Sequence, residues 1–350
     1  MTLSPVFRSA EAVETLRAAG VWDRLRPAAL GQAAAIATVK RDLPAVLDQR
    51  FIDQSELGEE HIDGDMRFFQ EFFFLILFRS ILQTIRFSEA ALDLCSQLNF
   101  CIKGTITAAD NLFDDQSKSL LPLTTGKGDR FASILQLMAF ERLTSLALSR
   151  GVASSAITPA AVEQFQKARM SRMAAIGSLE GSEEGGVASV LEPSVMIDEV
   201  HRVRGGALFE LGFIAPGLVD STVDHAVLKR AQSAISRLGT AFQIVDDLTD
   251  FEVDLERGTH NLLVAQITHA GTAEERTRLA ELRKTRAFTG DVVAEDFAVS
   301  GRLVVEIGER EARESLVELQ KIGFWFPPSL SDSLVKAIVG LEGIERMKAL

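Results

Sequence analysis

The sequence predicts an all-α protein, and three observations support that fold class. Apolar residues recur with helical periodicity through most of the chain, few alternating runs typical of strands appear, and the nine prolines lie mostly at junctions between periodic segments. The predicted helices cover residues 10–19, 30–51, 65–87, 88–113, 130–149, 159–176, 197–218, 226–253, 273–284 and 291–322.

The N-terminal residues 1–60 are predicted to form helices that pack on a main helical domain of residues 61–350, the two together making one structural domain. With 350 residues, 47% of them hydrophobic, the chain can bury a core of that size. Its start, MTLSPVFRSAEAV, has no charged stretch followed by a long apolar core. We therefore expect no signal peptide.

The stretch most similar to a membrane span is FFQEFFFLILF, at residues 68–78. It is far shorter than the roughly 20 apolar residues that a bilayer requires, and Arg67, Glu71 and Arg79 interrupt or flank it. We predict a buried helix here and no transmembrane segment. Its phenylalanines either pack the core only, which we favour, or also line a substrate cavity.

The two cysteines, Cys95 and Cys101, lie in one apolar helical segment. This placement is typical of a buried, reduced pair and not of a disulfide framework. The sequence therefore predicts a cytoplasmic protein.

Two loops and one helix start can be read from the turn-forming residues. In LPLTTGKGDR, at residues 121–130, Lys127 either reaches a phosphate or, as we favour, belongs to a polar surface turn. Thr158 followed by Pro159 predicts a helix start with threonine as the cap. GSLEGSEEGG, at residues 177–186, predicts a flexible break, either a domain linker or a break between helices of one domain.

Residues 239–263, GTAFQIVDDLTDFEVDLERGTHNLL, carry three aspartates at spacings of four. On a helix Asp246, Asp250 and Asp254 lie above one another on one face, with Asp247 beside the first. One interpretation is a solvated acidic face. We favour a cation site, because apolar residues surround the acids and carboxylates near apolar walls are costly unless a cation pairs with them.

A second acidic run lies upstream, in TITAADNLFDD at residues 105–115. It repeats the spacing of four between Asp110 and Asp114, with Asp115 adjacent. Mg²⁺ prefers oxygen ligands and is usually held by one or two carboxylates together with substrate phosphates. Because neither run has a histidine or cysteine among its acids, the pair predicts Mg²⁺ and a phosphorylated substrate.

The formal net charge of −12 agrees with this prediction. Nucleic acid requires a basic surface, so it is excluded as a partner. An acidic protein that binds an anionic substrate needs metal ions between the two.

The two acidic runs resemble the aspartate-rich motifs of the trans-polyprenyl diphosphate synthases. FQIVDDLTD is similar to the second motif, and ADNLFDD is similar to a degraded form of the first, DDxxD. Between them HRVRGGALFELG, at residues 201–212, resembles the HxxKTGAL segment, with Arg204 in place of a diphosphate-binding lysine. The resemblance covers roughly residues 87–270.

This resemblance implies the class I isoprenoid synthase superfamily. Its fold is a single-domain helical bundle around a central apolar cavity, in which both motifs face the cavity and hold a cluster of three Mg²⁺ ions on a prenyl diphosphate. It also implies a homodimer, and it places the break at residues 177–186 inside one domain.

The chain departs from that family where a second substrate would bind. The arginine pair that follows the first motif is missing from QSKSLLPL, at residues 116–123, where Lys118 is the only basic residue. The N-terminal GGKxxRP segment is only weakly resembled by VWDRLRPAAL, at residues 21–30. These departures imply that the site for isopentenyl diphosphate is missing.

Other features resemble the terpene cyclases. Asp246, Asp250 and Asp254 fall at the spacing of the cyclase metal motif NDxxSxxxE, although its Asn and Ser are both Asp here, and ERGTHNLL resembles the RGxxHNLV that follows it. In those cyclases an upstream arginine senses the diphosphate, and Arg202 or Arg204 lies in about that place.

We therefore predict a Mg²⁺-dependent enzyme that acts on an allylic prenyl diphosphate. His260 receives no catalytic role, because a lone histidine in this position is more often structural. The predicted metal ligands are Asp110, Asp114, Asp246, Asp247, Asp250 and Asp254. The predicted catalytic residues are Asp110, Asp114, Asp246, Asp250 and Arg204, and the predicted diphosphate ligands are Arg204, Arg257, Lys118 and Lys127.

The leading prediction for the activity is ionisation followed by cyclisation or elimination, which gives a terpene. One alternative is a trans-prenyltransferase that condenses the substrate with isopentenyl diphosphate. The other is a homologue without catalytic activity, which binds prenyl diphosphates or serves as the partner subunit of an active synthase. The length of the substrate depends on cavity depth, which the sequence does not give.

Overall fold

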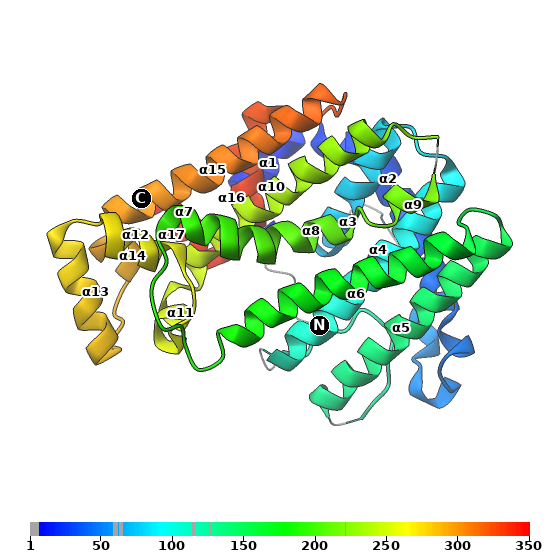
Figure 1. Cartoon of the computed structure of the whole chain (residues 1–350), viewed down its shortest axis with the longest axis horizontal. Helices are drawn as coiled ribbons and strands as arrows, with labels where there is room; N and C mark the ends of the chain where they lie inside the picture. Colours follow the sequence, from blue (N-terminus) through cyan, green and yellow to red (C-terminus); the bar gives the residue numbers. More distant parts are fainter. Residues whose placement is uncertain (1–6, 59–61, 63–65, 114–115, 127, 221) are drawn as a thin grey trace. The chain divides into compact units, whose positions relative to one another are not determined.

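A computed structural model describes residues 7–58, 62, 66–113, 116–126, 128–220 and 222–350 (Figure 1). Every regular element within these ranges is helical, apart from one isolated antiparallel bridge between Ile52 and Leu123. The all-α prediction is confirmed. Asp114, Asp115 and Lys127, which the sequence analysis singled out, lie outside the described residues.

The chain divides into two compact units, each built from several stretches of sequence. Among the described residues, unit 1 contains 22–58, 62, 66–113, 116–126, 128–169, 211–220 and 222–228. Unit 2 contains 7–21, 170–210 and 229–350. Because both units draw on residues after 60, these boundaries differ from the predicted 1–60 and 61–350, and the single structural domain stays a prediction.

Unit 1 is built around three long helices. The helix α4 packs against α5 and α3, and α3 is buried along most of its length, as predicted for residues 68–78. Cys95 and Cys101 on α4 are free and buried, also as predicted. The elements that lie wholly or largely in unit 1 are α2 (Val21–Arg41), η1 (Leu43–Ala45), η2 (Gln49–Phe51), η3 (Gln54–Glu56), α3 (Arg67–Thr84), α4 (Glu89–Phe113), α5 (Asp129–Ala153), the first part of α6 (Pro159–Ser182) and α9 (Pro216–Val219).

Unit 2 contains the last part of α6 and most of the second half of the chain. In it α15 packs against α16 and α12, and α16 also contacts α1 (Figure 1). Its elements are α1 (Ala10–Ala18), α7 (Pro193–Met196), the π-helix η4 (Ile197–Gly206), α8 (Ala207–Leu211), α10 (His225–Thr249), α11 (Phe251–Arg257), α12 (Leu262–Ala270), α13 (Ala273–Thr285), α14 (Val292–Asp296), α15 (Ala298–Lys321), η5 (Pro328–Leu330), α16 (Ser331–Ile338) and α17 (Leu341–Ala349).

Glycines allow η4 to approach α10 at backbone distance. A Cβ atom on Gly205 would lie 2.5 Å from the carbonyl oxygen of Gly239, and one on Gly206 would lie 2.9 Å from Thr240 Oγ1. Real Cβ atoms do not come that close, so these positions require glycine. The contact places the segment that carries Arg204 against the helix that carries the second acidic run.

The break predicted at residues 177–186 begins later than its first residue. The start of α6 is as predicted, with Thr158 Oγ1 accepting a hydrogen bond from Ala161 N at 3.2 Å. The helix then continues to Ser182, through Gly177 and Gly181, where the sequence predicted a break from residue 177. Each glycine costs a helix roughly 1 kcal/mol relative to alanine, and the ion pair that Glu180 makes with Arg204 offsets part of that cost.

One helix in the described part of the chain, α5, is long and apolar enough to cross a membrane by length and composition alone. Its most apolar window has a mean hydropathy of 1.3, and 44% of that window is buried. Core helices pass the same test, so α5 does not overturn the prediction that no segment spans a membrane.

Candidate functional site

The second acidic run lies where α10 ends and α11 begins. Asp250 N donates to Asp246 O at 3.0 Å, and Asp254 N donates to Asp250 O at 2.8 Å. These bonds keep helical spacing across the junction, so the three aspartates follow one another at one-turn intervals, as the sequence predicted. Asp246 and Asp250 are exposed, whereas Asp254 is half-buried.

Asp247 has a different environment, because its side chain is only 3% exposed. Its Oδ2 atom accepts a hydrogen bond from Leu262 N at 2.5 Å and lies 2.8 Å from His201 Nε2. Asn261 Nδ2 donates to the backbone oxygen of Asp247 at 2.7 Å. The carboxylate therefore joins α10 to η4 and to the start of α12.

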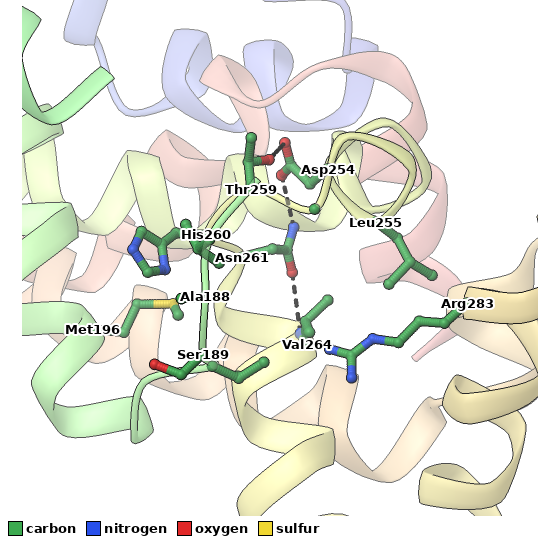
Figure 2. A pocket seen from close by; sticks show the side chains of 13 residues that line it. Ala188, Ser189, Met196, Asp254, Leu255, Thr259, His260, Asn261, Val264 and Arg283 are labelled. Carbon is green, nitrogen blue, oxygen red and sulfur yellow. Dashed lines mark hydrogen bonds between the residues drawn. The ribbon is translucent and has the colours of Figure 1, made fainter. Parts of the chain in front are cut away.

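Asp254 is held by the turn that follows α11 (Figure 2). Thr259 Oγ1 donates to Asp254 Oδ1 at 3.0 Å, and Asn261 Nδ2 donates to Oδ2 at 2.9 Å. Burial, and next the charge of Asp247, raise the pKa of the Asp254 carboxyl to about 7, although the two hydrogen bonds oppose that rise. The turn can form because Gly258 adopts a left-handed conformation, with φ of 72°.

Arg204 lies between two glutamates from the end of α6. Its Nη2 donates to Glu183 Oε1 at 2.5 Å, and its Nε lies 2.5 Å from Glu180 Oε1. Burial lowers the pKa of the guanidinium, but the charges of these glutamates outweigh burial and raise it above its ordinary value. Glu183 is 4% exposed and also accepts from His260 N at 3.2 Å, so it ties Arg204 to the turn after α11.

His260 contributes to this turn through its backbone N–H, which donates to Glu183 Oε2 at 3.2 Å. Its Nδ1 atom is buried and has no hydrogen-bond partner among the described residues. Burial lowers the pKa of its imidazole, which favours the neutral form. Arg257, the other predicted diphosphate ligand in unit 2, is exposed in the last turn of α11.

A cavity of about 230 Å³ lies beside this turn within unit 2. Figure 2 shows His260 and Met196 on one side of it and Arg283 on the other, with Asn261 and Asp254 along its edge. Its lining includes Asp254 but neither of the exposed aspartates of the second run.

The described part of the first acidic run lies in unit 1, at the end of α4. Asp110 is exposed, and the neighbouring Asn111 fixes the chain that follows: its Oδ1 accepts from Lys118 N at 3.1 Å and its Nδ2 donates to Lys118 O at 2.8 Å. The Lys118 side chain is exposed. A hollow of about 380 Å³ lies beside Asn111, between the end of α4 and the start of α5.

The donors of the second run fit Mg²⁺. No group of three or more His, Cys, Asp or Glu side chains in the described ranges is close enough to hold a metal ion by itself. Mg²⁺ does not need such a group, since it keeps several waters and binds one or two carboxylates together with substrate phosphates. The exposed carboxylates of Asp246 and Asp250, one helical turn apart, match that ligand set.

Sequence reasoning missed the residues that hold this site in place. Glu180 and Glu183, at the end of α6, pair with Arg204, and His201, the first residue of the HRVRGGALFELG segment, was given no role although it contacts Asp247. Lys103 on α4 was also missed; burial lowers the pKa of its amine, and the charges of Glu71 and Asp110 act on it in the opposite direction. The burial of Asp247 had a signal, because Ile244, Leu248 and Phe251 mark the same helix face as apolar.

Comparisons with family models and with curated protein sequences find no match. Solved structures do match. A decaprenyl diphosphate synthase from Rhodobacter capsulatus superposes with a TM-score of 0.57 at 15% identity, covering 93% of this chain and 98% of the other. A geranylgeranyl pyrophosphate synthase from Lactobacillus brevis gives 0.59 at 14% identity, covering 90% and 97%.

The chain has the fold of the prenyl diphosphate synthases. A polyprenyl synthase from Caulobacter crescentus, in complex with calcium and isoprenyl diphosphate, also matches, with a TM-score of 0.54 at 15% identity over 89% of this chain and 95% of that one. At these identities the likeness concerns the fold alone. The fold expected from the two acidic runs and the HRVRGGAL segment is therefore confirmed.

Proposed function

We propose that this protein is a Mg²⁺-dependent class I isoprenoid synthase that ionises an allylic prenyl diphosphate. The observation that carries the proposal is the exposed pair Asp246 and Asp250 at the end of α10, on a fold that solved prenyl diphosphate synthases share. The Caulobacter crescentus synthase in complex with calcium and isoprenyl diphosphate supports the same class of ligands.

The reaction breaks the allylic carbon–oxygen bond and leaves the electron pair on the diphosphate. Bound Mg²⁺ would supply Lewis-acid stabilisation of that negative charge. In unit 2, Asp246 and Asp250 would hold the metal, with Asp254 behind them, whereas the contacts of Asp247 suit it to hold the end of the helix. Asp110, with Asp114 outside the described residues, remains the proposed metal site of the first run.

Arg204 and Arg257 are the proposed diphosphate ligands in unit 2. Arg204 is already paired with Glu180 and Glu183, so a diphosphate must either share the guanidinium with these carboxylates or displace them. Lys118, in unit 1, and Lys127, outside the described residues, are proposed for the same role.

For the fate of the cation we propose cyclisation or elimination to a terpene. The loop after the first motif supports this outcome, because Lys118 stands there without the arginine pair that binds a second diphosphate in elongating synthases. The cyclase-like spacing of Asp246, Asp250 and Asp254 supports it as well.

The second candidate is a trans-prenyltransferase that adds isopentenyl diphosphate. Two observations favour it: the solved structures that match are named as prenyl diphosphate synthases, and Lys103 is a half-buried lysine on which the charges of Asp110 and Lys118 act. The third candidate is a homologue without catalytic activity. It is favoured by the ion pairs that Arg204 already makes with Glu180 and Glu183, because a diphosphate would have to compete with them.

One incubation series separates these candidates. Purified protein with Mg²⁺ is given geranyl, farnesyl or geranylgeranyl diphosphate, each with and without isopentenyl diphosphate, and the products are analysed as volatiles and as diphosphates. We expect a hydrocarbon or alcohol without isopentenyl diphosphate, and none from Asp246→Ala. Longer diphosphates that form only with isopentenyl diphosphate would establish the prenyltransferase, and a lack of product in every reaction would favour the non-catalytic homologue.

A further inference from the structure

Arg346, on α17, contacts the end of α10 that carries the second acidic run. The residue is 6% exposed. Its Nη1 donates to Leu248 O and, at 3.3 Å, to Thr249 O, which are carbonyls of the last turn of α10. Its Nη2 donates to Glu252 Oε1 at 2.5 Å, on α11.

The same guanidinium reaches a fourth element. Arg346 Nε donates to Asp291 Oδ1 at 3.3 Å, and this carboxylate also accepts from Ala294 N at 3.2 Å as the cap of α14. One side chain thus joins α10, α11, α14 and α17 around the junction at Asp250. Because the donors of a guanidinium lie in one fixed plane, these hydrogen bonds fix the relative positions of the groups that accept them and also bring a positive charge.

Close packing supports the same arrangement. A Cβ atom on Gly343 would overlap Thr249 Oγ1, and one on Gly340 would lie 3.3 Å from Thr249 Cγ2. The residues of α17 therefore lie directly against the last residue of α10, the position between the paired carboxylates of Asp246 and Asp250.

We propose that Arg346 is a positioning residue for the metal-binding end of α10. This inference rests on the proposed function, because it concerns the Mg²⁺ that Asp246 and Asp250 would hold. By fixing the carbonyls of Leu248 and Thr249 and the side chain of Glu252, the guanidinium holds the helix junction in the register that keeps the two carboxylates one turn apart.

The direction in which metal affinity changes when Arg346 is replaced distinguishes a positioning role from a purely electrostatic one. Arg346 is a cation near a cation-binding site, so Coulomb repulsion alone predicts that its removal tightens metal binding. Positioning predicts the opposite, because loss of a group that orients metal ligands typically weakens metal affinity by roughly 10- to 100-fold.

The experiment is a titration of the full chain with Mn²⁺ in the presence of inorganic pyrophosphate, followed by electron paramagnetic resonance of the protein-bound ion, which needs no turnover. Mn²⁺ is the probe because it accepts the same carboxylate ligands as Mg²⁺. The proteins compared are the wild type, Asp246→Ala, Arg346→Met and Arg346→Lys, with Lys348→Met as the matched control. Lys348 is an exposed cation of α17, and it pairs with Glu11 of α1, away from α10.

We expect the wild type to bind Mn²⁺, Asp246→Ala to lose this binding, and Lys348→Met to match the wild type. Both Arg346 variants should bind at least about tenfold more weakly, the lysine variant included, because one ammonium cannot serve four acceptors in different directions. Circular dichroism checks that each variant remains helical. If the Arg346 variants do not fold, Gly343→Ala, which crowds Thr249 without changing charge, should show the same weakening.

Three results would overturn the inference. Unchanged binding by Arg346→Lys together with tighter binding by Arg346→Met would assign Arg346 a role through charge only. If the Arg346 variants do not fold and Gly343→Ala is used in their place, wild-type Mn²⁺ affinity in Gly343→Ala would show that the packing of α17 against Thr249 does not affect metal binding. Failure of the wild type to bind Mn²⁺ would remove the proposed metal site itself, and with it the basis for both proposals.

Discussion

Two adjacent aspartates of the second acidic run have opposite environments. Asp246 is exposed, whereas Asp247 is 3% exposed and contacts His201 and the backbone N–H of Leu262. An exposed carboxylate can be reached by a cation from solvent, while a buried carboxylate with fixed donors stabilises the local fold. We therefore assign cation binding to Asp246 and a structural role to Asp247.

This division predicts different consequences for the same substitution. Asp247→Asn should lower the free energy of unfolding by about 2–4 kcal/mol, because it weakens a buried, hydrogen-bonded pair. Asp246→Asn should change it by less than about 0.5 kcal/mol and should instead remove Mn²⁺ binding. Urea unfolding of both variants in EDTA measures the first effect. Equal destabilisation by the two substitutions would contradict the assignment.

The raised pKa of Asp254 predicts a pH dependence of stability. Its ordinary value is 3.8 and its value in the folded chain is about 7, so between these pH values the folded state holds a proton that the unfolded state has lost. The stabilisation is therefore greatest at low pH and is lost as the pH rises through 7. Relative to Asp254→Asn, the wild type should lose about 2–3 kcal/mol between pH 5 and pH 8.

The measurement is thermal or urea unfolding of both proteins at the two pH values, without metal ions, since a bound cation would itself keep the carboxylate charged. Comparison with Asp254→Asn cancels the titration of other groups. A difference between the two proteins that does not change with pH would show that Asp254 has an ordinary pKa.

Arg204 provides a test of diphosphate binding that does not depend on turnover. Arg204→Ala should weaken the Mg²⁺-dependent binding of inorganic pyrophosphate by roughly tenfold or more, the effect of losing one charge-assisted contact of about 1.5–3 kcal/mol. Glu180→Gln, which frees part of the guanidinium, should not weaken it. Isothermal titration calorimetry gives both values, and wild-type affinity in Arg204→Ala would remove this residue from the proposed site.

At the scale of elements, a glycine at the contact between η4 and α10 and a glycine in the last turn of α6 are expected to respond in opposite ways to substitution by alanine. Gly205→Ala should cost several kcal/mol, because the added methyl group overlaps the backbone of Gly239 and cannot be accommodated by a rotamer change. Gly181→Ala in α6 meets no atom within 4 Å and should raise the free energy of unfolding by roughly 0.5–1 kcal/mol through better helix propensity. Urea unfolding of both variants checks the contrast, which would fail if the two changes had the same sign.

Periodicity located the long helices but not where each one ends or bends. It predicted α4 and α13 to within a residue or two and missed α12, a nine-residue helix capped by Asn261 Oδ1. It also gave one helix over residues 226–253, where the chain bends at Asp250. Contacts with distant segments, such as those of Arg346 at this bend, decide these points, and they leave no periodic signal in the sequence.

The same reasoning explains which parts of the site were predictable. A spacing of four predicts that Asp246, Asp250 and Asp254 follow one another at one-turn intervals, and backbone hydrogen bonds keep that spacing across the bend at Asp250. Glu183 lies in another segment than Arg204, and His201 lies 46 residues before Asp247, so only the folded chain brings these pairs together. Local chemistry is thus readable from sequence, whereas the groups that position it depend on tertiary packing.

At the scale of the whole molecule, the apolar face of α5 supports a homodimer. Phe131, Ile134 and Met138 are 58%, 46% and 60% exposed and recur at helical spacings of three and four, so they form one stripe on the helix surface. Large apolar stripes on a single chain mark interaction sites. We expect a second copy of the chain to cover this one.

The test is the mass of the protein in solution. Light scattering after size exclusion should give twice the mass of one chain for the wild type, and Met138→Glu should shift it toward one chain, because a charge within an apolar interface has to be desolvated. Leu30→Glu is the matched control: Leu30 is 52% exposed on α2, outside the stripe, and its substitution should leave the dimer intact. A wild-type mass of one chain, together with binding to lipid vesicles that Met138→Glu abolishes, would instead assign the stripe to a membrane surface.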